Sequence, residues 1–545
     1  MLIGQVADER YVALAEVALE FRNDRGESWE ARSRAGGSVF AELPPGEYRV
    51  VLNEPGYGAK FSRVFVPSPT PHLFRLLSDG LVGYAWPKWV RAGEASEFRV
   101  HSVEPYKLEL WRYGAEPEFV KALGWHDEHG PRATMQVTPD GDYTRTGVEW
   151  NKVGYANSVH SQHVPGPERS GLYYFRACTK GGRRFAFPWI VAPAKPIAPL
   201  AVLASNITWN AYNSFGGRSN YIHADGLPPT PTVNSRQELK RYSDAGFFTW
   251  NAKEYPPLSF DRPEPFNDID FDERPTDPIE GRQACHLAPA EWRLLGWMER
   301  HDFAYDYYAE TQLHDGTLDL AAYKALVISV HPEYWTREMY DRVKRWVFHD
   351  GGRLIYLGGN GLNCEVTIEG SAMTCANGRL RSLWPDGMGG HESRMHLTHE
   401  SEANLLGVVF TPSGAMTGAP YRAVDASHRY FEGTDLKDGD LFGTASLHMR
   451  CPGGASGHET DKVSASSPAN VHRLAKGTNP DGGGAEMVVF DTPNGGRVFS
   501  AGSINYVASL PVDENISRIT ANVLRDFVDS SSTASDSQPP EQLPH

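Results

Sequence analysis

The fold is decided by two runs of sequence, Ala325-Leu-Val-Ile-Ser-Val-His-Pro-Glu-Tyr-Trp335 and Arg353-Leu-Ile-Tyr-Leu-Gly-Gly-Asn360. Each contains a short, almost uninterrupted apolar segment, which is typical of a strand buried on both faces. Between them, apolar residues recur at helical spacing from Met339 to Val347, and Thr336 is placed to cap that helix. The stretch therefore predicts one β-α-β unit, and such units place ligand sites beyond the carboxyl ends of their strands.

His331, Glu333 and Asn360 follow the two predicted strands directly. A polar side chain is costly inside a buried strand, but it is accessible just past the end of that strand. We therefore take these three residues as the first site candidates. Local sequence leaves a second interpretation open, in which His331 and Asn360 only satisfy loose backbone groups of the loops.

Composition limits the classes of function. The chain has 545 residues, which predicts several domains, and a net charge of −15 without a long basic run, which argues against a nucleic-acid partner. We find no signal peptide and no apolar stretch of the roughly 18 residues that a membrane span needs. The five cysteines are scattered and lack metal-type spacing, so a reduced, cytoplasmic protein is expected.

The first half of the chain reads as two all-β modules. In residues 1–77, Val12–Phe21 and Glu47–Leu52 alternate partly and predict strands, and the turn that begins at Leu43 resembles that of small prealbumin-like β-sandwiches. Residues 78–195 contain further alternating strands, for which an Ig-like β-sandwich is the simplest arrangement. We see no polar cluster that would make the first module catalytic.

From residue 196 to residue 528 apolar runs alternate with helical patterns, which predicts an α/β catalytic domain. Helices are expected over 288–301 and 516–528, and a closing hairpin is expected near 487–503. Residues 529–545 are polar and rich in serine, which is typical of a disordered tail.

Other loops contain further candidate residues. A long aromatic loop contains Tyr255, and a Gly-rich loop contains Glu459; glycines let a backbone approach a site, although they more often only make turns. A loose group of histidines, His391, His396 and His399, matches no zinc signature. The glycines of a nucleophile elbow are absent around Cys364, and no Gly-x-Ser-x-Gly elbow or Walker phosphate loop is present.

Six motifs follow one another along the chain. They are Pro199-Leu-Ala-Val-Leu203, Thr208-Trp-Asn-Ala-Tyr-Asn213, Gly216-Gly217 with Ser219 and Tyr221, Ser259-Phe-Asp-Arg-Pro263, His331-Pro-Glu-Tyr-Trp335 and Leu357-Gly-Gly-Asn360. In this order they resemble the large, catalytic subunit of the N,N-dimethylformamidase family. Each motif alone is weak, whereas the ordered set is specific and covers about residues 78–528. At the N-terminus a small sandwich stands where the family has a larger lectin-like domain, which leaves assembly and substrate range open.

The resemblance implies an α/β domain like that of class I glutamine amidotransferases (flavodoxin-like), here without their cysteine. It implies one mononuclear ferric ion, Fe(3+), held by two tyrosines and one glutamate. It also implies hydrolysis of N,N-dimethylformamide or a related small amide to formate and an amine, and a hetero-oligomer with a small subunit. Two phenolates and a carboxylate are hard oxygen donors, which suit ferric iron.

Carried onto this sequence, the family pattern makes Tyr212 the first tyrosinate ligand and Glu333 the carboxylate ligand. His331 and Asn360 become groups that orient the substrate or support the ligands. Tyr255 is expected as the second tyrosinate, and Tyr221 and Tyr242 are the alternatives that remain open.

Glu459 corresponds to the family's catalytic carboxylate, and Glu486 is its competitor. A proton acceptor of this kind would activate water and protonate the leaving amine. Two other functions stay open: hydrolysis of a larger amide on the same iron site, and a non-catalytic binding or scaffold role.

Overall fold

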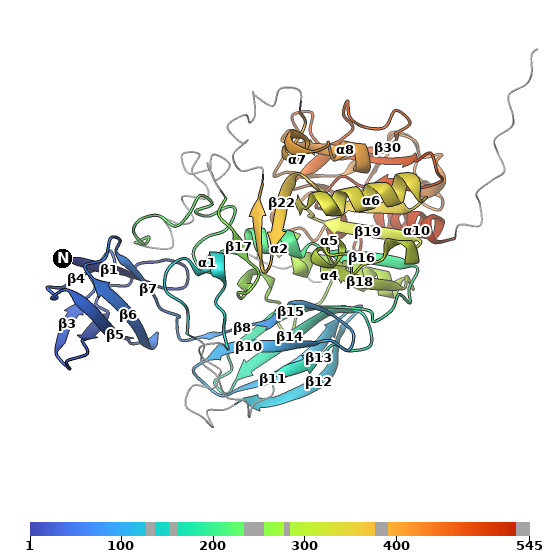
Figure 1. The fold of residues 1–545 in the computed structure, drawn as a ribbon. Coiled ribbons are helices and arrows are strands. Elements are labelled where there is room, and N and C mark those ends of the chain that lie inside the picture. Colours follow the sequence, from blue (N-terminus) through green and yellow to red (C-terminus); the bar gives the residue numbers. More distant parts are fainter. Residues whose placement is uncertain (127–136, 152–161, 234–254, 277–283, 377–390, 530–545) are drawn as a thin grey trace, which may run out of the picture.

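The computed structural model describes residues 1–126, 137–151, 162–233, 255–276, 284–376 and 391–529. Strands predominate over helices, and they group into two all-β parts followed by a large mixed sheet with helices (Figure 1). Tyr242 and all but the first residue of the predicted tail lie outside the described residues. None of the helices in the described part of the chain has the length and hydropathy of a membrane-spanning segment.

The first all-β part lies at one end of the molecule (Figure 1). One of its sheets contains β1 (Leu2–Ala7), β4 (Ser38–Phe40) and β7 (His72–Arg75), and the other contains β2 (Ala18–Arg22), β3 (Ser28–Arg32), β5 (Gly46–Glu54) and β6 (Gly58–Val66). Their buried side chains form a core of their own. The predicted strand over Val12–Phe21 is wrong in extent, because Glu16 has a φ of 62° and the chain becomes extended only at Ala18.

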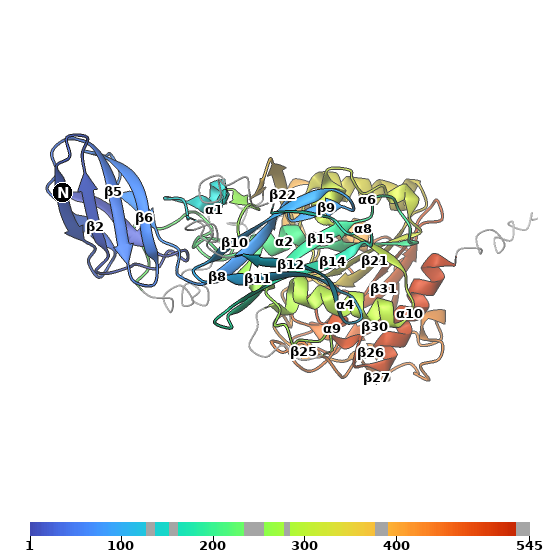
Figure 2. The ribbon, with the colours of Figure 1, turned by 90° about the horizontal axis from the view of Figure 1, so that it is seen from below.

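The second all-β part also consists of two sheets around one core. The smaller sheet contains β8 (Leu81–Trp86), β10 (Ala95–Ser102) and β13 (His163–Pro165); the larger contains β9 (Trp89–Arg91), β11 (Tyr106–Tyr113), β12 (Pro117–His126), β14 (Gly171–Thr179) and β15 (Arg184–Ala192). It lies beneath the large mixed sheet in Figure 1 and in front of it in Figure 2, and it contacts β18 and α4.

The large sheet has nine strands, and the candidate site lies at the carboxyl ends of its parallel strands. Its parallel half runs in the order β18 (Tyr305–Ala309), β16 (Leu200–Ala204), β19 (Ala325–Val330), β21 (Arg353–Gly358) and β32 (Arg497–Ser500). Its antiparallel half adds β31 (Glu486–Asp491), β30 (His472–Gly477), β26 (Tyr421–Ala423) and β27 (Leu441–Phe442). The predicted hairpin is therefore present as β31 and β32.

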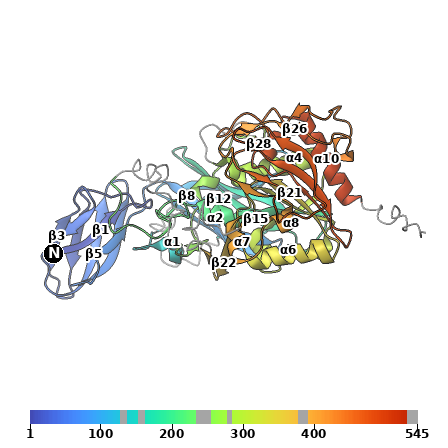
Figure 3. The same ribbon diagram turned by 90° about the horizontal axis from the view of Figure 1, so that it is seen from above.

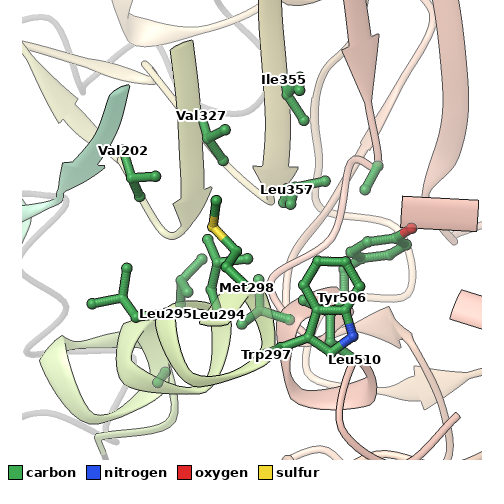
Figure 4. Packing of buried hydrophobic residues seen from close by; sticks show 14 of the residues in the cluster. Val202, Leu294, Leu295, Trp297, Met298, Val327, Ile355, Leu357, Tyr506 and Leu510 are labelled. Atoms are coloured by element: carbon green, nitrogen blue, oxygen red, sulfur yellow. The ribbon is translucent and has the colours of Figure 1, made fainter. Parts of the chain in front are cut away.

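Helices cover both faces of this sheet. The predicted β-α-β unit is present: β19 and β21 are parallel, and α6 (Arg337–His349) between them begins at Thr336, whose side chain accepts a hydrogen bond from the Met339 amide. On the opposite face, α4 (Ala288–Arg300), α9 (Tyr506–Ser509) and α10 (Glu514–Val528) contribute to the core that contains Val327 and Ile355 (Figures 3 and 4). Burial on both faces explains why β19 is apolar along its whole length.

Short elements complete the described chain. The helices are α1 (Tyr143–Thr146), α2 (Asn206–Tyr212), α5 (Glu310–His314), α7 (Arg394–Thr398) and α8 (Ala403–Leu406). The strands are β17 (Leu258–Ser259), β20 (Tyr334–Trp335), β22 (Cys364–Glu369), β23 (Ala372–Cys375), β24 (Val409–Thr411), β25 (Gly418–Ala419), β28 (Ser456–Gly457) and β29 (Thr460–Lys462).

Candidate functional site

The site forms where the parallel strands β16, β19 and β21 end, and the backbone there is strained. Val330, Asn360 and His458 all have positive φ, at 60°, 50° and 62°. A positive φ is especially unfavourable for a β-branched residue such as Val330, and conformations of this kind cost about 1–3 kcal/mol each. Val330 and Asn360 lie where β19 and β21 end, and His458 directly precedes Glu459 in the loop that brings this carboxylate to the site.

His331 occupies the centre of this group and is only 1% exposed. Its Nδ1 lies 3.0 Å from the Gly359 carbonyl oxygen, which fixes the ring. Its Nε2 lies 3.1 Å from the phenol oxygen of Tyr212, 3.1 Å from Oε2 of Glu333 and 3.7 Å from Oε2 of Glu459. Burial opposes a charge on the ring, but the hydrogen bond and charge of Glu333 outweigh it and raise the pKa of His331 to about 9.

Glu333 uses both carboxylate oxygens and is 2% exposed. Oε2 accepts a hydrogen bond from Tyr212 at 3.1 Å and another from Tyr221. Oε1 accepts from Arg394 at 3.2 Å and from the Cys364 thiol at 3.7 Å. Burial alone would raise the pKa of Glu333, yet His331 and Arg394 lower it, so the group is a carboxylate.

Tyr221 is the second tyrosine whose phenol contacts Glu333. Its ring stacks on that of Tyr212, with centroids 4.0 Å apart, and its phenol oxygen accepts a hydrogen bond from Tyr334 at 2.9 Å. Burial, followed by the charge of Glu333, raises the pKa of Tyr221 well above its usual value. Tyr255, which the sequence predicts as the second tyrosinate ligand, is buried beside β23. It interacts electrostatically with Arg394.

Glu459 and Asn360 form the opposite side of the group. The side-chain amide of Asn360 donates to Oε2 of Glu459 at 2.8 Å. Burial raises the pKa of Glu459. Its competitor Glu486 is engaged elsewhere, where it accepts hydrogen bonds from the Val463 amide at 3.0 Å and from Arg473 at 2.9 Å. The geometry thus brings Glu459, and not Glu486, to His331.

Sequence reasoning missed His286 and Arg394, because neither lies in a motif or at the end of a predicted strand. The ring of His286 lies 4.6 Å from Tyr212 and 5.5 Å from His331, measured between centroids. Two of the histidines noted from sequence have partners of their own, since His399 pairs with Asp341 at 2.7 Å and His396 accepts from the Glu392 amide at 3.1 Å.

The comparison with known proteins agrees with the expected family. The model of the family described as "N,N-dimethylformamidase beta subunit-like, C-terminal" matches residues 109–519. The chain belongs to this family. The match includes every site residue from Tyr212 to Glu459, whereas residues 1–108, and with them the first all-β part, lie outside it.

Two curated relatives are N,N-dimethylformamidase beta subunits. That of an Alcaligenes species is 28% identical over 405 residues, which is 63% of this chain and 50% of the relative. That of Paracoccus aminophilus is 28% identical over 289 residues, which is 44% of this chain and 37% of the relative. The chain therefore spans half or less of the length of these N,N-dimethylformamidase subunits.

The solved structures that match parts of this chain are only weakly similar to it, with very low TM-scores. One is a DUF3823 family protein from Bacteroides ovatus, with a TM-score of 0.13 and 10% identity over 34% of this chain and 96% of that one. Another is BcpA, the major pilin subunit of Bacillus cereus, with a TM-score of 0.15 and 11% identity over 37% of this chain and 71% of that one.

Proposed function

We propose that this protein is an iron-dependent amidohydrolase that converts N,N-dimethylformamide, or a related N-substituted amide, to formate and an amine. Membership of the N,N-dimethylformamidase beta subunit-like family supports the reaction class. The observation that carries the proposal is the meeting of two phenols on one carboxylate oxygen, since Tyr212 and Tyr221 both donate to Oε2 of Glu333.

This donor set fits a ferric ion. Phenolate and carboxylate oxygens are hard donors, which favour Fe(3+) over zinc or copper(I). Three anionic ligands would also neutralise the charge of the ion. Within the ranges that the structure describes, no three His, Cys, Asp or Glu side chains form a metal-binding group. We propose Tyr212, Glu333 and Tyr221 as ligands, with Tyr255 as the alternative to Tyr221.

The remaining side chains have separate roles in the proposed reaction. When bound, ferric iron supplies Lewis acidity, which polarises the amide carbonyl and acidifies water. Glu459 takes the proton of the attacking water and delivers it to the nitrogen as the carbon–nitrogen bond breaks. His331 donates a hydrogen bond from Nε2 to the oxygen that becomes negative, a role worth roughly 3–4 kcal/mol. Asn360 holds Glu459 in position through their 2.8 Å hydrogen bond.

The arrangement of the chain supports further parts of the proposal. Five parallel strands with helices on both faces support a relation of residues 196–528 to the flavodoxin-like fold of class I glutamine amidotransferases. We propose an Ig-like sandwich for residues 78–195 and a prealbumin-like sandwich for residues 1–77. Because the curated relatives are named beta subunits, we also propose that this chain assembles with a second kind of subunit.

Removal and return of the metal tests the proposed function. Protein treated with an iron chelator should lose the release of formate and dimethylamine from N,N-dimethylformamide, and Fe(3+) should restore it better than Zn(2+). Glu333→Ala provides the matched control, because added Fe(3+) should not restore its activity. Full activity of iron-free protein would contradict the proposal.

A further inference from the structure

A cavity of about 760 Å3 opens beside the candidate site. Tyr212, Tyr221 and His286 line its inner end. The all-β parts provide the opposite wall, through Leu77, Val82 and Phe185. Cavities of about 300–1,000 Å3 enclose ligands of drug size, and N,N-dimethylformamide is far smaller than such ligands. The space is therefore much larger than the smallest proposed substrate requires.

Aromatic rings form one part of the cavity wall, and polar residues such as Glu9, Arg10 and Ser78 form another. Phe185, Phe215 and Phe266 line the cavity in addition to the two tyrosines. Aromatic rings pack favourably against one another in offset or edge-to-face arrangements, and such pairs contribute about 0.5–1.5 kcal/mol beyond the burial of their area. The aromatic part of the lining favours a flat, apolar substituent.

His286 provides the polar contact between the cavity and the site. Its side chain is only 3% exposed, and neither ring nitrogen has a hydrogen-bond partner among the residues that the structure describes. Buried nitrogens without a partner are costly, so a missing ligand group is a physical explanation for both. The ring lies 4.6 Å from that of Tyr212, between centroids, which places it where an amide would meet the site.

We propose that the cavity binds an amide whose nitrogen carries an aromatic substituent, with the ring among the phenylalanines and the amide group hydrogen-bonded to His286. This inference rests on the proposed amidohydrolase function and names its substrate class. One water is consumed: the carbonyl carbon gains a hydroxyl group, the carbon–nitrogen bond breaks, and the nitrogen leaves as an aryl amine after gaining a proton.

Part of the wall lies outside the match to the family. Leu77 and Val82 precede residue 109, where the match to the family begins. The substrate range thus depends on a surface that the family match does not include.

The test compares turnover of N-phenylformamide with that of N,N-dimethylformamide in iron-loaded protein. We expect kcat/KM for N-phenylformamide to be about 10-fold higher or more, from burial of the ring. Val82→Trp narrows the cavity and should lower kcat/KM for N-phenylformamide more than for N,N-dimethylformamide, so that the preference is lost. Val120→Trp is the matched control, because Val120 is 37% exposed on β12 and does not line the cavity. Ile222→Trp narrows the same cavity from a loop if Val82→Trp does not fold.

Binding of N-phenylformamide, measured by calorimetry, separates failure of the inference from failure of the proposed function. Hydrolysis of N,N-dimethylformamide without binding of N-phenylformamide would overturn the inference and leave the function in place. Binding that Val82→Trp and His286→Phe weaken, with no amide hydrolysed, would support the cavity and overturn the function. Equal effects of Val82→Trp and Val120→Trp on both amides would also overturn the inference.

Discussion

The phenol oxygen of Tyr212 lies 3.1 Å from Oε2 of Glu333, although 121 residues separate the two in sequence. Tyr221 donates to the same carboxylate oxygen. Because burial and Glu333 raise the pKa of Tyr221 far above its usual value, its phenol stays protonated unless a cation stabilises the phenolate. A convergence of three oxygens of this kind is the structural basis of the proposed metal site.

The second tyrosinate ligand can be identified with a matched pair of variants. Tyr221→Phe removes the phenol oxygen that contacts Glu333, so we expect the iron content to fall severalfold, whereas Tyr255→Phe should keep it near the wild-type level. Iron per protein chain, measured by mass spectrometry of the metal, checks this. Loss of iron in Tyr255→Phe alone would return the assignment to Tyr255.

Glu459→Gln should separate a base from a ligand. The variant keeps the shape of the side chain and removes the proton acceptor, so we expect normal iron content and a kcat lower by about 10²–10⁴-fold. Steady-state kinetics together with iron content measure both effects. Glu486→Gln is the control and should retain near-normal turnover, since its carboxylate contacts Val463 and Arg473 instead. Iron loss in Glu459→Gln would show that this residue is a ligand.

A pH effect on stability is expected from Glu291 in α4. Burial raises its pKa to about 7, although Tyr307 and the Ser205 amide donate hydrogen bonds to it. The folded chain therefore holds a proton that the unfolded chain, with a pKa of about 4.3, has released. Stability should fall as the pH rises from about 4.3 to about 7, and it should not recover above that range.

Glu291→Gln should make this fall smaller, because an amide does not titrate. Urea midpoints at pH 5 and pH 8 measure the difference, with Glu20→Gln on the surface of β2 as the control. A pH dependence in Glu291→Gln equal to that of wild type would contradict the explanation.

Much of the parallel sheet could be predicted from sequence because its signals are local. The apolar runs of β16, β19 and β21 arise because these strands are buried on both faces. The helical spacing of apolar residues in α6 arises because this helix is buried on one face only. The pairing of β21 with β32 could not be predicted in this way. The strand β32 comes from near the end of the chain, and pairing over such a distance in sequence leaves no periodic pattern.

The candidate site was predictable only in part for the same reason. Glu333 and Asn360 follow strand ends, which a sequence displays, whereas the choice between Tyr221 and Tyr255 depends on how two loops fold back. His286 and Arg394 reach the site through tertiary packing alone, so no local signal indicates them.

The most direct test of the proposed iron site is the iron content and visible absorption of protein purified from unsupplemented cells. We predict about one iron per chain and a visible phenolate-to-iron charge-transfer band. The band should weaken in Tyr212→Phe, and both iron and band should be lost in Glu333→Ala. Tyr174→Phe, which removes a buried phenol that donates to the Asn267 carbonyl away from the site, should leave both unchanged. Colourless, iron-free wild-type protein with full amidase activity would contradict the proposed iron site.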